Sequence, residues 1–175
     1  MRQKIWTYGL ISGAILLAAM FGLMPVWERT GNYQLAEIVG YATMVIALST
    51  IFFAVRQHRD QVLGGQIRFK EAFLLGLYIA LVASAVYVIG WMLYISIVDN
   101  SFMETYYQHY LEQLRNSGQP AEEIEAQIRQ MEEYKDLYRK PWVQVGVTFM
   151  EIFPVGLLIA LLSAALLRRS TPATT

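Results

Sequence analysis

Four long apolar segments constrain this chain more than any other feature of its sequence. They cover residues 5–24, 35–55, 72–98 and 143–167, and the only charged residues in them are Glu37 and Glu151. A helix crosses the ~30 Å hydrocarbon core of a membrane with about 20 apolar residues. Backbone polar groups in lipid must be bonded within their own segment, so these segments are expected to be helices. The sequence predicts an all-α fold, a single integral membrane domain over 1–175 that forms a four-helix bundle.

The basic residues near the segment ends fall mostly on one side. That side holds the eight residues Arg2, Lys4, Arg56, Arg59, Arg68, Lys70, Arg168 and Arg169. The loop 99–141 on the other side has five basic and nine acidic residues. Because cytoplasmic loops carry the excess of Lys and Arg, we expect both termini in the cytoplasm and loop 99–141 in the periplasm.

The first segment carries a packing signal and a stop signal. Gly9 and Gly13 are four residues apart, a spacing that lets a neighbouring helix approach closely. Pro25, Val26 and Trp27 follow the segment and are expected to end its helix at the outer interface.

The loop 99–141 is too polar to cross a membrane and has the periodicity of helices. Apolar residues recur at helical spacing on both sides of Gly118 and Pro120, which fit the end of one helix and the start of the next. We predict a helical hairpin outside the membrane. Its aromatic stripe is expected to form the hairpin's own core; the alternative is a surface for a partner or for lipid.

Glu151 requires a physical account because a charged side chain at the centre of a span costs about 2.5–3.5 kcal/mol. Pro154 frees one backbone carbonyl beside it. The hydrogen-bonding groups expected at matching depth are Tyr41, Thr43, Tyr87 and Trp91. These residues with Glu151 and Pro154 form a candidate intramembrane polar cluster. We expect a neutral acid that ties three helices together; the alternative is a proton-coupled or ligand-binding site.

Two other groups of charged residues have simpler interpretations. Glu37 lies near the outer end of its segment, where it is expected to reach interfacial water or Arg29. The basic residues between the second and third segments are expected to set topology, and contact with lipid headgroups is the alternative. The candidate headgroup contacts are Arg56, Arg59, Arg68 and Lys70.

Common signatures of catalysis and cofactor binding are missing from the sequence. There is no cysteine, and the two histidines, His58 and His109, are expected on opposite sides of the membrane. Metalloprotease, phosphate-loop and serine-nucleophile motifs are also absent. The basic residues form thin layers beside the segments, unlike a nucleic-acid-binding face. We therefore expect no catalytic site, no metal or other cofactor and no nucleic-acid partner.

Several short stretches in fixed order resemble a family of bacterial membrane proteins, domain-of-unknown-function family 4199. They lie at residues 40–44 (GYATM), 56–60 (RQHRD), 64–69 (GGQIRF) and 151–156 (EIFPVG). The resemblance covers nearly the whole chain. It implies four spans, an extramembrane helical insertion before the last span, and a bacterial inner-membrane location, but no activity.

These observations favour a non-enzymatic interaction or accessory component of the membrane. Its expected partners are the lipid bilayer and a membrane or periplasmic protein. The alternative is a small proton-coupled transport or ligand-binding protein centred on Glu151.

Overall fold

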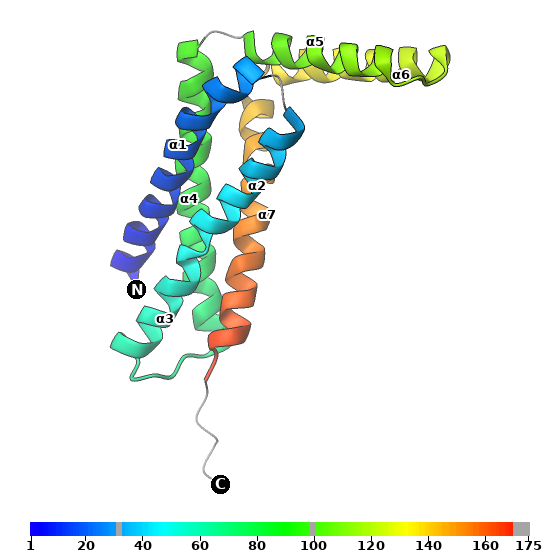
Figure 1. Cartoon of the computed structure of the whole chain (residues 1–175). Helices are drawn as coiled ribbons and strands as arrows, with labels where there is room; N and C mark the ends of the chain where they lie inside the picture. Colours follow the sequence, from blue (N-terminus) through cyan, green and yellow to red (C-terminus); the bar gives the residue numbers. More distant parts are fainter. Residues whose placement is uncertain (31–32, 99–100, 170–175) are drawn as a thin grey trace. The chain divides into compact units, whose positions relative to one another are not determined.

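The computed structural model describes residues 1–30, 33–98 and 101–169, and within them every regular element is a helix. Figure 1 labels the helices in chain order. Their bounds are α1 Arg2–Thr30, α2 Tyr33–Leu48, α3 Thr50–Val62, α4 Phe69–Val98, α5 Ser101–Asn116, α6 Ala121–Tyr138 and α7 Pro141–Leu167. The prediction of an all-α fold is confirmed.

Four stretches of these helices are long and apolar enough to cross a membrane. They are Arg2–Met24, Leu35–Val62, Phe69–Ile97 and Pro141–Leu167. Each overlaps one of the four predicted segments, and the second consists of α2 followed by α3. The four-span prediction is therefore consistent with the structure.

The chain forms two compact units. The first contains Met1–Ile89 and Phe149–Thr175, and the second contains Gly90–Thr148. Helices α4 and α7 contribute residues to both units, whereas α1, α2 and α3 belong to the first and α5 and α6 to the second.

Close contacts at glycines hold the helices of the first unit together. A Cβ atom on Gly9 would lie 2.6 Å from Val82 Cβ, and one on Gly13 would lie 2.5 Å from Val86 Cγ1, so α1 packs directly on α4. A Cβ on Gly76 would lie 2.9 Å from Ala160 Cβ, which places α4 equally close to α7. The close approach predicted from the Gly9 and Gly13 spacing is confirmed.

The structure differs from expectation at the end of α1. The helix continues through Pro25 to Thr30, so the prediction that it ends at Pro25 was wrong. A proline inside a helix removes a single backbone hydrogen bond. One proline is therefore not enough to end the helix.

The second span is interrupted at Ser49, which the apolar pattern did not indicate. The Ser49 hydroxyl donates to the Val45 carbonyl at 2.6 Å, and the Thr50 hydroxyl donates to the Ala47 carbonyl at 2.9 Å. The Phe52 N–H then bonds to the Ser49 carbonyl, three residues back, at 3.0 Å. Hydroxyl bonds to the preceding turn bend helices, which accounts for the boundary between α2 and α3.

In the second unit, α5 and α6 pair through side chains from both helices. Lys135 Nζ lies 2.5 Å from the Glu104 carboxylate and 4.5 Å from the centre of the Tyr107 ring. The Tyr107 hydroxyl donates to Glu132 at 3.0 Å. Tyr107 and Leu114 on α5 are buried. The location of this α5–α6 pair outside the membrane stays a prediction.

Candidate functional site

Glu151 lies on the outward face of α7. Met150 and Leu158 on this face are 66% and 57% exposed, and Glu151 and Pro154 are exposed as well. Gly156, on the opposite side of the helix, packs against Ala80 of α4. Residues three, four and seven apart share one face of a helix, so the sequence of α7 places the acid among exposed apolar side chains.

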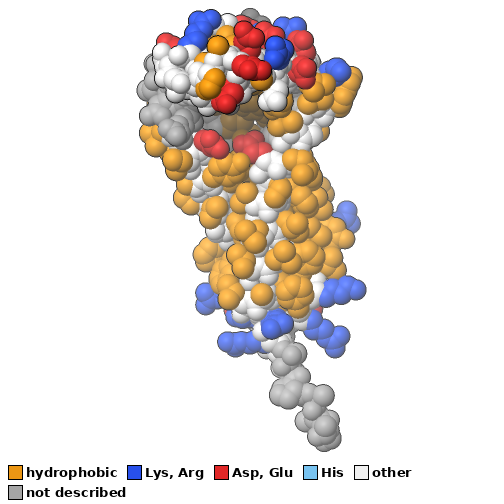
Figure 2. All heavy atoms as spheres, turned by 90° about the vertical axis from the view of Figure 1, so that its right-hand side faces the viewer, with side chains coloured by type: hydrophobic (Ala, Val, Ile, Leu, Met, Phe, Trp, Pro, Cys, Tyr) orange, Lys and Arg blue, Asp and Glu red, His pale blue; other side chains and the backbone are white. Residues whose placement is uncertain are grey.

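A second acid, Glu37 of α2, is close enough to Glu151 for its charge to act on it. Glu37 is also exposed. Among the side chains that the structure describes, none forms a hydrogen bond or an ion pair with either carboxyl group. Figure 2 shows acidic side chains interrupting the hydrophobic surface of the spans. The two carboxyls form an acidic pair with two oxygens each to offer to a cation or an N–H donor.

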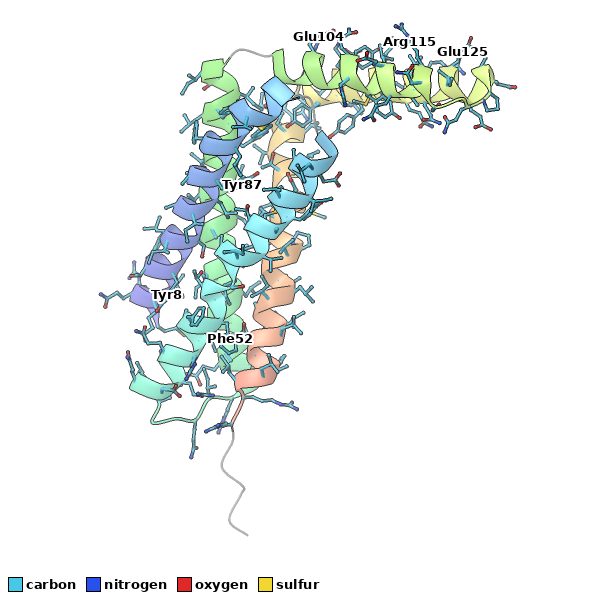
Figure 3. The ribbon with its side chains drawn as sticks, viewed as in Figure 1. Tyr8, Phe52, Tyr87, Glu104, Arg115 and Glu125 are labelled. Carbon is cyan, nitrogen blue, oxygen red and sulfur yellow. The ribbon has the colours of Figure 1, made fainter. Side chains whose placement is uncertain are left out.

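The structure does not gather the predicted polar cluster around Glu151. The Thr43 hydroxyl donates to the Val39 carbonyl of its own helix at 2.8 Å, and the Tyr41 side chain is exposed. Tyr87, labelled on α4 in Figure 3, is half-buried against the apolar core of the first unit. Trp91 belongs to the second unit, where its indole N–H donates to the Tyr138 hydroxyl at 2.8 Å.

Two further expectations concerned residues near the acids: Pro154 beside Glu151, and Arg29 as the partner of Glu37. Pro154 lies inside α7, which continues on both sides of it, as a proline in a span requires. The side chain of Arg29, the basic partner expected for Glu37, lies outside the part of the chain that the structure describes.

The four candidate headgroup contacts divide into two groups. Arg56, Arg68 and Lys70 are exposed. Arg59 is only 9% exposed: its Nε donates to Asp60 Oδ1 at 2.6 Å and its Nη1 donates to the Leu167 carbonyl at 3.4 Å. A cation at the C-terminal end of a helix is favoured by the macrodipole. Arg59 therefore caps the C-terminal end of α7, and too little of its side chain is exposed to bind a lipid headgroup.

A backbone pairing at the same end brings in two basic residues that were not candidates. Ile67 and Arg169 form an isolated antiparallel bridge. It holds the end of α7 beside the loop that precedes α4, so Arg168 and Arg169 join the basic residues of that loop. Figure 2 shows Lys and Arg side chains gathered at this end of the hydrophobic surface.

A partly buried chain of polar side chains between α1 and α3 was also missed. Ser12 Oγ lies 2.5 Å from Thr50 Oγ1. The Tyr8 hydroxyl (Figure 3) donates to Gln57 Oε1 at 3.2 Å, and Lys4 Nζ donates to the same oxygen at 2.8 Å. Lys4, Tyr8 and Ser12 are spaced by four residues, so their shared helix face was a signal that the sequence offered.

His58 lies near this chain and is buried. Its Nε2 is 4.0 Å from a Glu71 oxygen of α4, whereas Nδ1 has no hydrogen-bond partner among the described residues. Within that part of the chain, no group of three or more His, Asp or Glu residues could hold a metal ion.

One comparison with known proteins gives a match. A family model described as "Protein of unknown function (DUF4199)" matches residues 7–169. No curated protein and no solved structure matches the chain.

Proposed function

The chain belongs to the family of proteins of unknown function DUF4199, and we propose that it is a non-enzymatic, multi-pass membrane protein that acts as an interaction or accessory component. Its four candidate spans support a location in a membrane. The family resemblance implies a bacterial inner membrane, and the distribution of basic residues favours both chain ends in the cytoplasm.

The exposure of Glu151 is the observation that carries this proposal. An acid on the lipid-facing surface of a span is unfavourable unless something pairs with it. No described side chain forms an ion pair or a hydrogen bond with Glu151. A partner helix with a basic or N–H-donating side chain would complement both carboxyls, so the acidic pair fits a contact with another membrane protein.

The alternative function, proton-coupled transport or ligand binding, needs an acid enclosed by helices and reached by water. Glu151 faces outward, and the hydroxyl of Thr43 is occupied within α2. This arrangement favours an interaction surface over an internal pathway.

The α5–α6 pair offers a second surface for a partner outside the membrane. Most of its aromatic stripe is used internally, since Tyr107 and Tyr138 are buried. Tyr134 and Leu137 of α6 are exposed. This surface is small, so we assign it a supporting role beside the acidic pair.

Site-specific photocrosslinking in native membranes tests the proposal. A photoreactive residue at Glu151 should form a covalent adduct with one membrane protein, identified by mass. The matched control is Leu158, which lies on the same face of α7 two turns further along and is similarly exposed. It should give lipid adducts and much less of the protein adduct.

The Glu37→Gln variant completes the experiment. Removing the second carboxyl should weaken the adduct at position 151 while the protein still accumulates. Equal adducts at positions 151 and 158, or lipid adducts alone at both, would count against an interaction role. A water-filled cavity at Glu151, detected by labelling of a cysteine at 151 with a membrane-impermeant reagent, would favour the transport alternative.

A further inference from the structure

The pairing between Ile67 and Arg169 fixes the positions of two neighbouring arginines. The Ile67 N–H donates to the Arg169 carbonyl at 3.1 Å, and the Arg169 N–H donates to the Ile67 carbonyl at 3.0 Å. The bridge is isolated, and on each side the neighbouring residue toward the helix is an arginine. Those residues are Arg68, at the start of α4, and Arg168, at the end of α7.

The register of the two helices agrees with this placement. Gly76 of α4 faces Ala160 of α7. The two helices are antiparallel. Counting eight residues back from Gly76 reaches Arg68, and counting eight residues forward from Ala160 reaches Arg168. The two arginines therefore lie at the same level, at the end of the α4–α7 contact.

Neither arginine is neutralised by a described side chain. Arg68 and Arg168 are exposed, and no ion pair or hydrogen bond within the described residues involves either side chain. Two acids lie at this end: Asp60 is engaged by Arg59 at 2.6 Å and lies 3.8 Å from Arg56, and Glu71 lies 4.0 Å from His58 Nε2. Like charges placed opposite each other repel, so an anion between the two guanidinium groups would stabilise the arrangement.

We propose that Arg68 and Arg168 form a two-arginine site for a phosphate group, as carried by an anionic lipid headgroup or by free phosphate. Each guanidinium presents a planar fork of N–H donors that matches phosphate oxygens in a bidentate contact. The site lies where the hydrophobic surface ends and basic side chains begin (Figure 2), which is the level of lipid headgroups. It is separate from the acidic pair and goes beyond the proposed function.

Native mass spectrometry of the full-length protein in detergent, titrated with phosphatidylglycerol or phosphatidylcholine, tests the site. The wild type should bind phosphatidylglycerol more tightly than phosphatidylcholine. Each basic contact at a membrane surface changes binding roughly fivefold, so Arg68→Gln/Arg168→Gln should weaken phosphatidylglycerol binding roughly 25-fold. Adding inorganic phosphate distinguishes the two sources: displacement of the lipid identifies a site for free phosphate groups, and its absence identifies a headgroup site.

The matched control is Arg2→Gln/Arg56→Gln, which removes the same charge from basic residues near the same end but leaves the bridge intact. It should weaken binding by less than about threefold if position matters more than total charge. Equal weakening by both double variants, or equal wild-type binding of the two lipids, would overturn the proposal. The Arg68→Lys/Arg168→Lys variant keeps the positive charges but lacks the planar guanidinium groups. Its affinity for phosphatidylglycerol should lie between those of the wild type and the Gln variant. If the Gln variant does not fold, this variant replaces it in the comparison.

Discussion

Arg56 and Arg59 lie about one turn apart on α3, yet their surroundings differ. The Arg56 side chain is 59% exposed, whereas Arg59 is buried and donates to the Leu167 carbonyl of α7. Both residues belong to one short basic cluster, and no local sequence feature distinguishes their roles. Their difference depends on where α7 ends, more than 100 residues later. The structural role of Arg59 depends on this distant contact, so it was not predictable from the residues around Arg59 in the sequence.

Glu151 illustrates the same limit and leads to a prediction about stability. Glu151→Leu should leave the free energy of unfolding unchanged or raise it, because no described side chain loses a hydrogen bond and an acid within a span is replaced by an apolar residue. The upper bound is the ~3.5 kcal/mol that a charged side chain costs at the centre of a span. Unfolding of the purified protein in mixed micelles with a denaturing detergent measures the change.

The matched control is Leu158→Glu, which places an acid on the same face of α7 two turns further along. It should lower the free energy of unfolding or reduce insertion. Destabilisation by Glu151→Leu of more than about 1 kcal/mol would show that the carboxyl is a structural tie after all.

The helices themselves were largely predictable, because each span is an apolar run and each extramembrane helix has a regular stripe. The Gly9 and Gly13 spacing also indicated one contact between helices. The break at Ser49 was not predictable from hydropathy, since serine and threonine occur in spans without bending them. The hydroxyl bonds to Val45 and Ala47 produce it.

Substitution at Gly13 tests the α1–α4 contact. In Gly13→Ala the new Cβ would lie 2.5 Å from Val86 Cγ1, so the helices must move apart. Overpacking of this kind costs about 1–3 kcal/mol. Gly22→Ala is the control, because nothing lies within 4 Å of its Cβ, and it should be neutral or slightly stabilising. Equal effects of the two variants on unfolding would argue against the contact.

The α5–α6 pair should lose stability in acid. The hydrogen bond from Lys135, and then that from Gln108, holds the pKa of Glu104 below its usual value of 4.5. A lowered pKa stabilises the folded form at pH values above 4.5, and the contribution disappears as the pH falls through the lowered pKa. The protection factors of the α5 backbone amides, which correct for the intrinsic pH dependence of exchange, should therefore fall below about pH 4.5.

Glu104→Gln should reduce this pH dependence, since Gln has no charge to lose. Glu112→Gln removes another exposed acid from α5 and should leave the dependence unchanged. If wild type and Glu104→Gln showed the same pH dependence of exchange in α5, the Glu104 carboxylate would not be the cause of the loss of stability in acid.

At the scale of the whole molecule, the division into two units matches the thickness of a membrane. A core of ~30 Å is crossed by roughly 20 residues. Counting that length from Ala72 ends near Trp91, and counting back from Leu167 ends near Thr148. The first unit gives way to the second at Ile89 on α4 and at Phe149 on α7. We therefore expect the first unit to contain the membrane-spanning parts of α4 and α7.

Reporter fusions test the orientation that follows from the basic residues. Fusions after Asp60 and after Arg169 should be active only with a cytoplasmic reporter, and a fusion after Gly118 only with a periplasmic one. Periplasmic activity from the fusion after Arg169 would contradict four spans with the N-terminus inside.

The bridge between Ile67 and Arg169 also constrains the order of biosynthesis. When the ribosome has synthesised only the first three spans, Arg169, the bridge partner of Ile67, does not yet exist. The loop before α4 can be fixed only after residue 169 has emerged from the exit tunnel, close to the end of translation of this region. A nascent chain stalled earlier would hold its first three helices in the translocon with that loop unpaired and accessible to proteases.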